Sequence, residues 1–155
     1  MEKGKGKELH LYYDPISQPC RTVLNIFKIA NVEFKHHIIN IFKGEQHKAD
    51  FKKLNPLMKV PVLVVGKDVV INDSAAIIRY ICDSFKVREA ILPRSDLIAR
   101  AKVDALIDYN ASTVRTALTE TYIVQTIILP KIFKVPAPRM EHMVQMYTTK
   151  IFPVC

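Results

Sequence analysis

The sequence predicts an α/β domain followed by an all-α region, and three observations lead to this fold class. Strand-like and helix-like spacings of apolar residues take turns over residues 9–85. Two β-branched runs, at 60–65 and 69–71, are joined by the turn residues GKD. Residues 96–129 contain neither Pro nor Gly and repeat apolar side chains at helical intervals.

The chain is expected to open with a strand, a loop and a helix. Residues 9–13, LHLYY, alternate apolar and polar side chains as a strand does. Pro15 and Pro19 bracket a loop, and proline suits the first turn of a helix. Residues 21–30 place apolar side chains three and four positions apart, which predicts the helix.

The next elements complete the predicted domain. Residues 32–41 read as a second strand, and the polar segment that follows reads as a loop with a short helix. The two β-branched runs predict an antiparallel hairpin. Asp73 or Ser74 then caps a helix that runs to residue 85. The order β-α-β-α-β-β-α is that of a thioredoxin-like domain.

We therefore predict four regions along the chain. Residues 1–7 are a flexible basic N-terminus, 8–85 the thioredoxin-like domain, 86–95 a linker and 96–155 a helical region. The linker has no apolar period and contains a proline. The weak helix formers that follow Asn110 predict a bend in the long helix.

The composition of the chain argues against a membrane-spanning, secreted or metal-binding protein. Of 155 residues 49% are hydrophobic, enough for a buried core, but no run approaches the length of a membrane span and no secretory signal opens the chain. Three cysteines form neither a metal-ligand pair nor an even disulfide set. We expect a cytoplasmic protein with no metal and no membrane span.

The net charge of +8 does not indicate nucleic-acid binding. Residues 1–85 hold 13 basic against 9 acidic side chains and residues 86–155 hold 10 against 6, so each half carries +4 without a large basic block. An anionic small molecule or an acidic protein surface is the expected partner, rather than DNA or RNA.

Three short segments carry residues suited to chemistry, and each has a purely structural alternative. Ser17 precedes a helix N-terminus, where it is only a cap or turn residue or donates a hydrogen bond to an anion. Pro61 opens a strand, where a cis bond would expose the backbone of Val60 to an extended peptide. Asp73 and Ser74 cap a helix or hold the two charged ends of an α-amino acid. Together they describe a groove for a peptide with a zwitterionic end.

The sequence resembles the theta class of the glutathione S-transferase family over about residues 8–134. The matching segments are LHLYYDPISQPCRTV, KGEQHKADFKKLNPLMKVPVL, NDSAAIIRYI and LIARAKVDALIDY, in the family's order and spacing. The resemblance implies a dimeric detoxification enzyme with glutathione as co-substrate and a small electrophile as second substrate.

The resemblance also implies roles for individual residues. Ser17 would be the catalytic serine that hydrogen-bonds the glutathione sulfur and favours its thiolate, since a free thiol with a pKa of about 8.5 is mostly protonated at pH 7. The thiolate would attack an electrophilic carbon or a peroxide oxygen. The implied glutathione contacts are Lys59, Val60, Pro61, Asp73, Ser74 and either Gln46 or its neighbour His47. The first long helix would supply the wall of the electrophile pocket through Arg100, Asp104 and Tyr109.

The region after residue 95 is shorter than the family's helical domain, so two hypotheses stay open. In the first, the chain is a glutathione transferase with an intact glutathione half-site. In the second, it is a catalytically weak or inactive module that serves as a binding or structural subunit, docked on another protein through exposed helices. The sequence does not name the electrophile.

Overall fold

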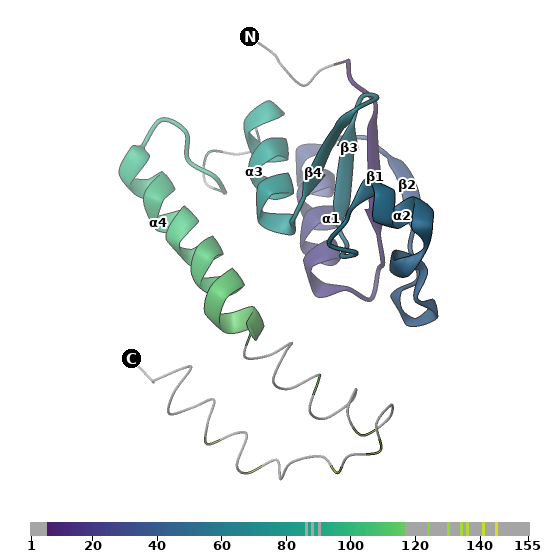
Figure 1. Ribbon diagram of the computed structural model, residues 1–155. Coiled ribbons are helices and arrows are strands. Elements are labelled where there is room, and N and C mark those ends of the chain that lie inside the picture. Colours follow the sequence, from purple (N-terminus) through teal and green to yellow (C-terminus); the bar gives the residue numbers. More distant parts are fainter. Residues whose placement is uncertain are drawn as a thin grey trace. The chain divides into compact units, whose positions relative to one another are not determined.

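The computed structural model describes residues 6–85, 87, 89 and 91–116, with residues 124, 130, 134, 136, 141 and 145 as isolated positions. The chain divides into two compact units, Met1–Leu97 and Ile98–Cys155 (Figure 1). The predicted boundaries of the four regions stay predictions. Within the described ranges, no helix has both the length and the apolar character required to cross a membrane.

A four-stranded mixed sheet forms the centre of the first unit, which confirms the predicted fold class. Its strands are β1 (Leu9–Tyr13), β2 (Lys35–Ile38), β3 (Val62–Val65) and β4 (Val69–Asn72), in the spatial order β2-β1-β3-β4. β1 pairs with β2 in parallel, whereas β3 is antiparallel to both β1 and β4. A parallel pair needs a crossover connection, and the helix between β1 and β2 supplies it.

β2 is shorter than the predicted strand over 32–41, and the end of the preceding helix explains the difference. Asn31 ends that helix with a left-handed φ of 51°. The N–H of Val32 donates a hydrogen bond to the carbonyl of Phe27 at 3.1 Å. Val32 therefore belongs to the cap of this helix and does not begin the strand. At the other end, Asn40 caps a 3₁₀ turn over Ile41–Lys43.

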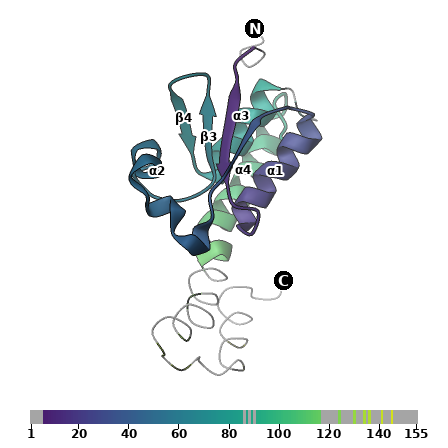
Figure 2. The same cartoon turned by 90° about the vertical axis from the view of Figure 1, so that its right-hand side faces the viewer.

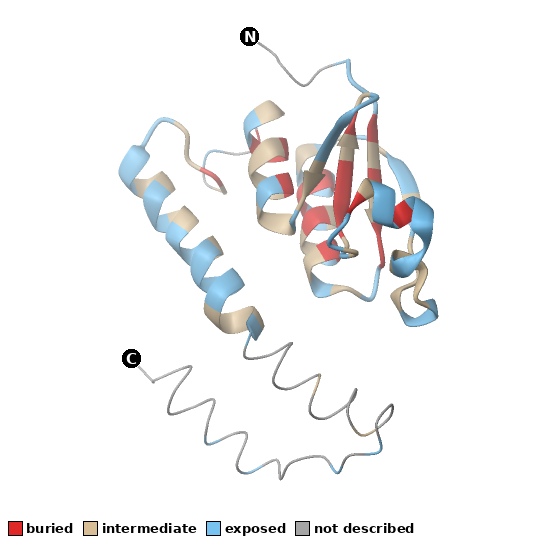
Figure 3. Cartoon of the chain, in the orientation of Figure 1, coloured by how far each residue is buried: buried red, intermediate tan, exposed pale blue. Residues whose placement is uncertain are grey.

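Helices cover both faces of the sheet. Figure 2 shows α1 (Gln18–Ala30) and α3 (Ser74–Ser84) on one side of it and α2 (Ala49–Leu54) on the other. The alternation in β1 explains this layering, because Leu9, Leu11 and Tyr13 are buried while the residues between them are half-buried. Figure 3 shows the buried residues on the central strands and on the helices beside them. The largest fully buried apolar side chains are Phe27, Leu11, Leu63, Ile77, Ile81, Leu92, Val23 and Val62.

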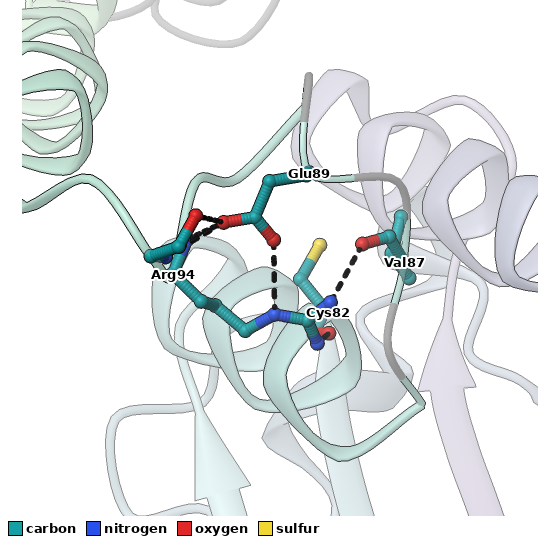
Figure 4. Close-up of polar contacts among 5 residues, drawn as sticks. Cys82, Val87, Glu89 and Arg94 are labelled. Atoms are coloured by element: carbon teal, nitrogen blue, oxygen red, sulfur yellow. Dashed lines mark hydrogen bonds and ion pairs between the residues drawn. The ribbon is translucent and has the colours of Figure 1, made fainter.

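The end of the first unit is held by a polar cluster around Glu89 (Figure 4). Its carboxylate accepts hydrogen bonds from the backbone N–H groups of Arg94 and Ser95, at 2.5 and 2.7 Å, and from the Ser95 hydroxyl at 2.8 Å. The guanidinium of Arg94 donates to the carbonyls of Cys82 and Val87, at 3.2 and 3.3 Å. These bonds fasten the segment after α3 to the last turn of that helix.

The helix α4 (Leu97–Tyr109) begins at the last residue of the first unit and otherwise belongs to the second; it is the first of the predicted helices after the linker. A π-helical turn, Asn110–Val114, follows it directly. The regular α-helical hydrogen bonding thus changes at the point where the sequence predicts a bend. Beyond residue 116 only isolated residues are described, so most of the predicted 96–155 helical region lies outside the described ranges.

Candidate functional site

The strand register brings the predicted glutathione-site segments of the first unit to one edge of the sheet. Tyr12 pairs with Val62, and Val62 pairs with Asn72, so these residues form one row across three strands. β1 and β4 run toward this edge and β3 starts from it, since β3 is antiparallel to both neighbours. The loop with Ser17 and the segments 59–61 and 73–74 therefore all leave the sheet on the same side.

Ser17 is the N-cap residue of α1, but its hydroxyl makes no capping hydrogen bond. Its backbone is extended, with φ −70° and ψ 122°, and its carbonyl accepts from the N–H of Arg21 at 3.1 Å. The side chain is half-buried beside the helix N-terminus. The side chain thus makes no cap, while the N–H of Ser17 donates to the carbonyl of Asp14 at 3.0 Å, so Ser17 also has the turn role of the purely structural alternative. Its hydroxyl is left for another acceptor.

Two side chains that the site prediction omitted hold the Ser17 loop in place. The buried carboxylate of Asp14 accepts from the N–H of Ile16 through Oδ1 and from the N–H of Ile41 through Oδ2, both at 2.9 Å. Arg21 Nη1 donates to the carbonyl of Ile16 at 2.5 Å. The signal available in the sequence was a carboxylate at the end of a strand next to a proline, which also fits an ordinary turn.

The segment before β3 has the backbone form that the resemblance implies. The peptide bond between Val60 and Pro61 is cis. The β1–β3 ladder ends at Val62, so Val60 lies outside it. Lys59 is exposed, and its carbonyl accepts from Asn55 Nδ2 at 2.7 Å. Asn55 is 1% exposed and organises this turn from within.

Asp73 caps α3 and combines this role with an unusual backbone conformation. Its Oδ1 accepts from the N–H of Ala75 at 2.8 Å, which confirms the predicted cap. Its φ is +72°, a region that few residues other than glycine adopt. Asp73 is exposed and Ser74 half-buried, so an acidic group and a hydroxyl stand together at the helix N-terminus. This pairing suits a ligand with both an ammonium and a carboxylate.

Gln46 and His47, the two alternatives for one glutathione contact, point differently. Gln46 donates through Nε2 to the carbonyl of Ile41 at 3.3 Å, and its Oε1 is buried without a hydrogen-bond partner. His47 is exposed, with its Nε2 3.1 Å from Gln46 Nε2. The side chain of Gln46 therefore holds a buried oxygen without a hydrogen-bond partner, whereas the side chain of His47 is exposed to solvent.

The three predicted electrophile-pocket residues lie on α4. Arg100 Nε contacts Asp104 Oδ2 at 3.0 Å, one helical turn apart. Tyr109, the last residue of α4, is 44% exposed. Because all three belong to the second unit and the sheet belongs to the first, their part in a common pocket stays a prediction. In the part of the chain that the structure describes, no group of three His, Cys, Asp or Glu side chains is placed to hold a metal ion.

Comparison with known proteins matches residues 16–84 to the family model "Glutathione S-transferase, N-terminal domain". Human glutathione S-transferase theta-1 is 38% identical over 107 residues, which are 69% of this chain and 44% of that protein. The apo form of human glutathione-S-transferase T1-1 superposes with a TM-score of 0.80 at 29% identity, covering 91% of this chain and 59% of that one.

A second solved structure adds a ligand to the comparison. It is a human theta-class glutathione transferase in complex with the glutathione conjugate of 1-menaphthyl sulfate, with a TM-score of 0.74 at 26% identity. The match covers 92% of this chain and 61% of that one. The chain spans about half the length of the curated relatives it matches.

Proposed function

Because residues 16–84 form a glutathione S-transferase N-terminal domain, similar to that of theta-class enzymes, we propose that this protein binds glutathione and transfers its thiolate to electrophilic carbon. The observation that carries the proposal is the convergence of three segments on one sheet edge. The loop with Ser17, the Val60–Pro61 segment and the N-terminus of α3 all lie there, through the row of Tyr12, Val62 and Asn72.

Each segment is suited to one part of the tripeptide. The carboxylate of Asp73 takes the ammonium of the γ-glutamyl end, while the hydroxyl of Ser74 and the N-terminus of α3 take its carboxylate. The backbone of Val60, outside the strand ladder, pairs with the cysteinyl residue. The ammonium of exposed Lys59 attracts the glycyl carboxylate.

Ser17 is the proposed catalytic residue. Its hydroxyl makes no cap to α1, so it can donate a hydrogen bond to the sulfur of bound glutathione. A hydrogen bond to the charged form and a nearby helix N-terminus both stabilise a thiolate relative to a thiol. The thiolate attacks the electrophilic carbon, the C–S bond forms, and the leaving group departs with the electron pair of the broken bond.

Calorimetric titration with glutathione and with S-hexylglutathione tests binding. We expect micromolar-to-millimolar affinity for glutathione, which corresponds to a binding free energy of about −8 to −4 kcal/mol. Tighter binding of the hexyl derivative would indicate that the protein has an apolar surface next to the glutathione sulfur. A folded sample that binds neither compound contradicts the proposal.

Turnover is tested separately with 1-menaphthyl sulfate, the compound whose glutathione conjugate occupies the human theta-class structure. We expect the conjugate and free sulfate to form in equal amounts. Glutathione binding without conjugate would retain the first half of the proposal and reject the second. Cumene hydroperoxide in the same assay tests reduction of a peroxide oxygen by the thiolate.

The alternative function, a binding or structural subunit, is favoured by one observation on α4. Leu97, Ile98 and Leu106 are 79%, 71% and 69% exposed, an unusual level for large apolar side chains. Gel filtration discriminates between the two hypotheses. A self-contained cytoplasmic enzyme is expected as a homodimer of about twice the 17.7 kDa chain mass, whereas a subunit without its partner is expected to self-associate heterogeneously.

A further inference from the structure

Two histidines from adjacent strands meet on the face of the sheet where α2 lies. His10 is on β1 and His37 on the edge strand β2, and the register pairs Tyr12 with His37. Residues two apart in a strand share a face, so His10, Tyr12 and His37 project together. On the same face α2 places the ring of Phe51 edge-on to Tyr12, with 6.4 Å between the ring centroids.

The two imidazoles form a hydrogen bond with each other. His10 Nδ1 lies 2.9 Å from His37 Nε2. Such a bond needs a proton on one of the two nitrogens and a lone pair on the other. Stacking on Tyr12, 11° from parallel at a centroid distance of 4.3 Å, fixes the ring of His37 in this orientation. Whether the bond can form therefore depends on how many protons the pair of histidines holds.

A carboxylate directs the first added proton to His10. Glu8 Oε2 lies 3.2 Å from His10 Nε2, so this nitrogen keeps its proton and donates it to Glu8. In the neutral pair, His37 donates from Nε2 to the lone pair on His10 Nδ1. With one further proton, His10 becomes an imidazolium beside the carboxylate and donates from Nδ1 to the lone pair on His37 Nε2. The bond survives this step.

The second added proton has no position in this arrangement. His37 then carries its proton on Nδ1, so only its Nε2 can take another. That nitrogen faces the Nδ1–H of His10 at 2.9 Å. Its protonation would set two N–H groups and two positive charges against each other. The imidazoles must therefore separate when the second proton binds.

Neighbouring charges act in the same direction. Burial lowers the pKa of His37, and the positive charges of His10, Lys35 and His36 lower it further. The ammonium of Lys35 pairs with Glu8, and hydrogen bonds from Lys35 and His10 hold the pKa of Glu8 below its ordinary value. The carboxylate of Glu8 therefore stays ionised in the pH range where the histidines titrate.

The other elements on this face present apolar or exposed side chains. β3 contributes Val62 and Val64, the register partners of Tyr12 and His10. The charged side chains of α2 are all exposed to solvent: Asp50, Lys52 and Lys53.

We propose that the His10–His37 bond is an acid-sensitive switch on the edge strand β2, which stays closed with at most one added proton and opens with the second. In the described sheet β2 pairs with β1 alone, so loss of a side-chain bond between these strands weakens the attachment of β2. The switch does not rest on the proposed function, because neither histidine is a proposed glutathione contact.

Amide hydrogen exchange of the purified full chain without glutathione, followed by nuclear magnetic resonance and corrected for the intrinsic effect of pH, tests the proposal. The N–H of Ile39, directly after β2, reports on the attachment because it donates to the carbonyl of Tyr13 at 2.9 Å. Between about pH 7.5 and about pH 5, we expect its protection to fall at least about threefold, while β3 and β4 keep theirs. An unchanged Ile39 amide, or an equal fall in β3 and β4, would overturn the proposal.

His37→Gln isolates the titration from the hydrogen bond. The glutamine amide both donates and accepts, so it can match either protonation state of His10 but takes up no proton itself. Protection of Ile39 in this variant should be equal at both pH values. Persistence of the acid-induced loss in His37→Gln contradicts the switch.

His36→Gln is the matched control from the opposite face of β2, where His36 Nδ1 lies 3.0 Å from the Tyr13 hydroxyl. This hydroxyl both donates and accepts, so its contact tolerates either protonation state, and the acid-induced loss should remain in the variant. Its disappearance would assign the switch to His36 instead.

If His37→Gln does not fold, resonance of the imidazole nitrogens in the wild type decides. The two histidines should titrate in a coupled manner, with the second protonation below the ordinary histidine value of about 6.5. Independent titration of His10 and His37 rejects the switch.

Discussion

The buried carboxylate of Asp14 accepts a hydrogen bond from the backbone N–H of Ile41, 27 residues away, at 2.9 Å. Its other oxygen accepts from Ile16 at the same distance, so one side chain ties the loop before α1 to the segment after β2. These two segments carry Ser17, proposed to contact glutathione, and Gln46, one of the two alternatives for a further contact. A side chain with no proposed contact to the ligand thus joins two segments that carry candidate contacts.

Substitution of Asp14 should lower stability in steps. Asp14→Ala leaves two backbone N–H groups without their acceptor and is expected to cost about 1–3 kcal/mol. Asp14→Asn retains one acceptor oxygen and should fall between this variant and the wild type. Urea unfolding measures the order. Asp68→Ala, at an exposed turn, is the control, and equal stabilities for both Asp14 variants would contradict the bridging role.

Ser17→Ala should separate chemistry from folding. Since the hydroxyl makes no cap to α1, we expect the free energy of unfolding to change by less than about 0.5 kcal/mol, as for ordinary surface substitutions. The thiolate fraction of bound glutathione at neutral pH should fall about tenfold, measured by ultraviolet difference absorbance. Thr22→Ala, which removes a half-buried hydroxyl that is hydrogen-bonded to Gln18 on the same helix, is the control. An unchanged conjugation rate in Ser17→Ala would remove Ser17 from the mechanism.

Gln46 and His47 should differ in their effect on glutathione affinity. Gln46→Ala removes the buried oxygen that has no hydrogen-bond partner, and loss of one neutral hydrogen bond to the ligand is expected to weaken binding about 3- to 10-fold. His47→Ala changes an exposed side chain and should leave affinity within about twofold. Calorimetry on both variants makes the comparison. The reverse order would assign the contact to His47.

Acid should weaken the end of the first unit through Glu89. Hydrogen bonds from the backbone of Ser95 and of Arg94, and from the Ser95 hydroxyl, lower the pKa of Glu89 from 4.5 to about 2. A depressed carboxyl pKa contributes stability that is present above the unfolded value and is lost as pH falls from about 4.5 toward about 2. Thermal unfolding of the wild type and Glu89→Gln across this range should show their difference shrinking toward low pH. A constant difference contradicts the assignment.

Much of the fold could be predicted from the sequence because its elements rest on local patterns. The alternation in residues 9–13, the hairpin residues GKD and the acidic cap at Asp73 each act over a few neighbours. The strand predicted over 32–41 is longer than the observed β2, because the N–H of Val32 bonds to the preceding helix as part of its cap. The identity of a β-branched residue in an apolar run does not indicate whether its N–H will bond to a helix cap or to a neighbouring strand.

The sequence by itself determined the order of elements, the family and the identity of the candidate glutathione residues, because short motifs and periodicities carry that information. Only the tertiary structure decided that the Ser17 hydroxyl makes no capping hydrogen bond to α1 and that the Oε1 atom of Gln46 is buried. It also decided that the carboxylate of Asp14 accepts a hydrogen bond from the N–H of Ile41. It also decided the meeting of His10 with His37. Such contacts depend on strand register and chain crossover, which join residues far apart in the sequence and leave no trace in the local pattern of either one.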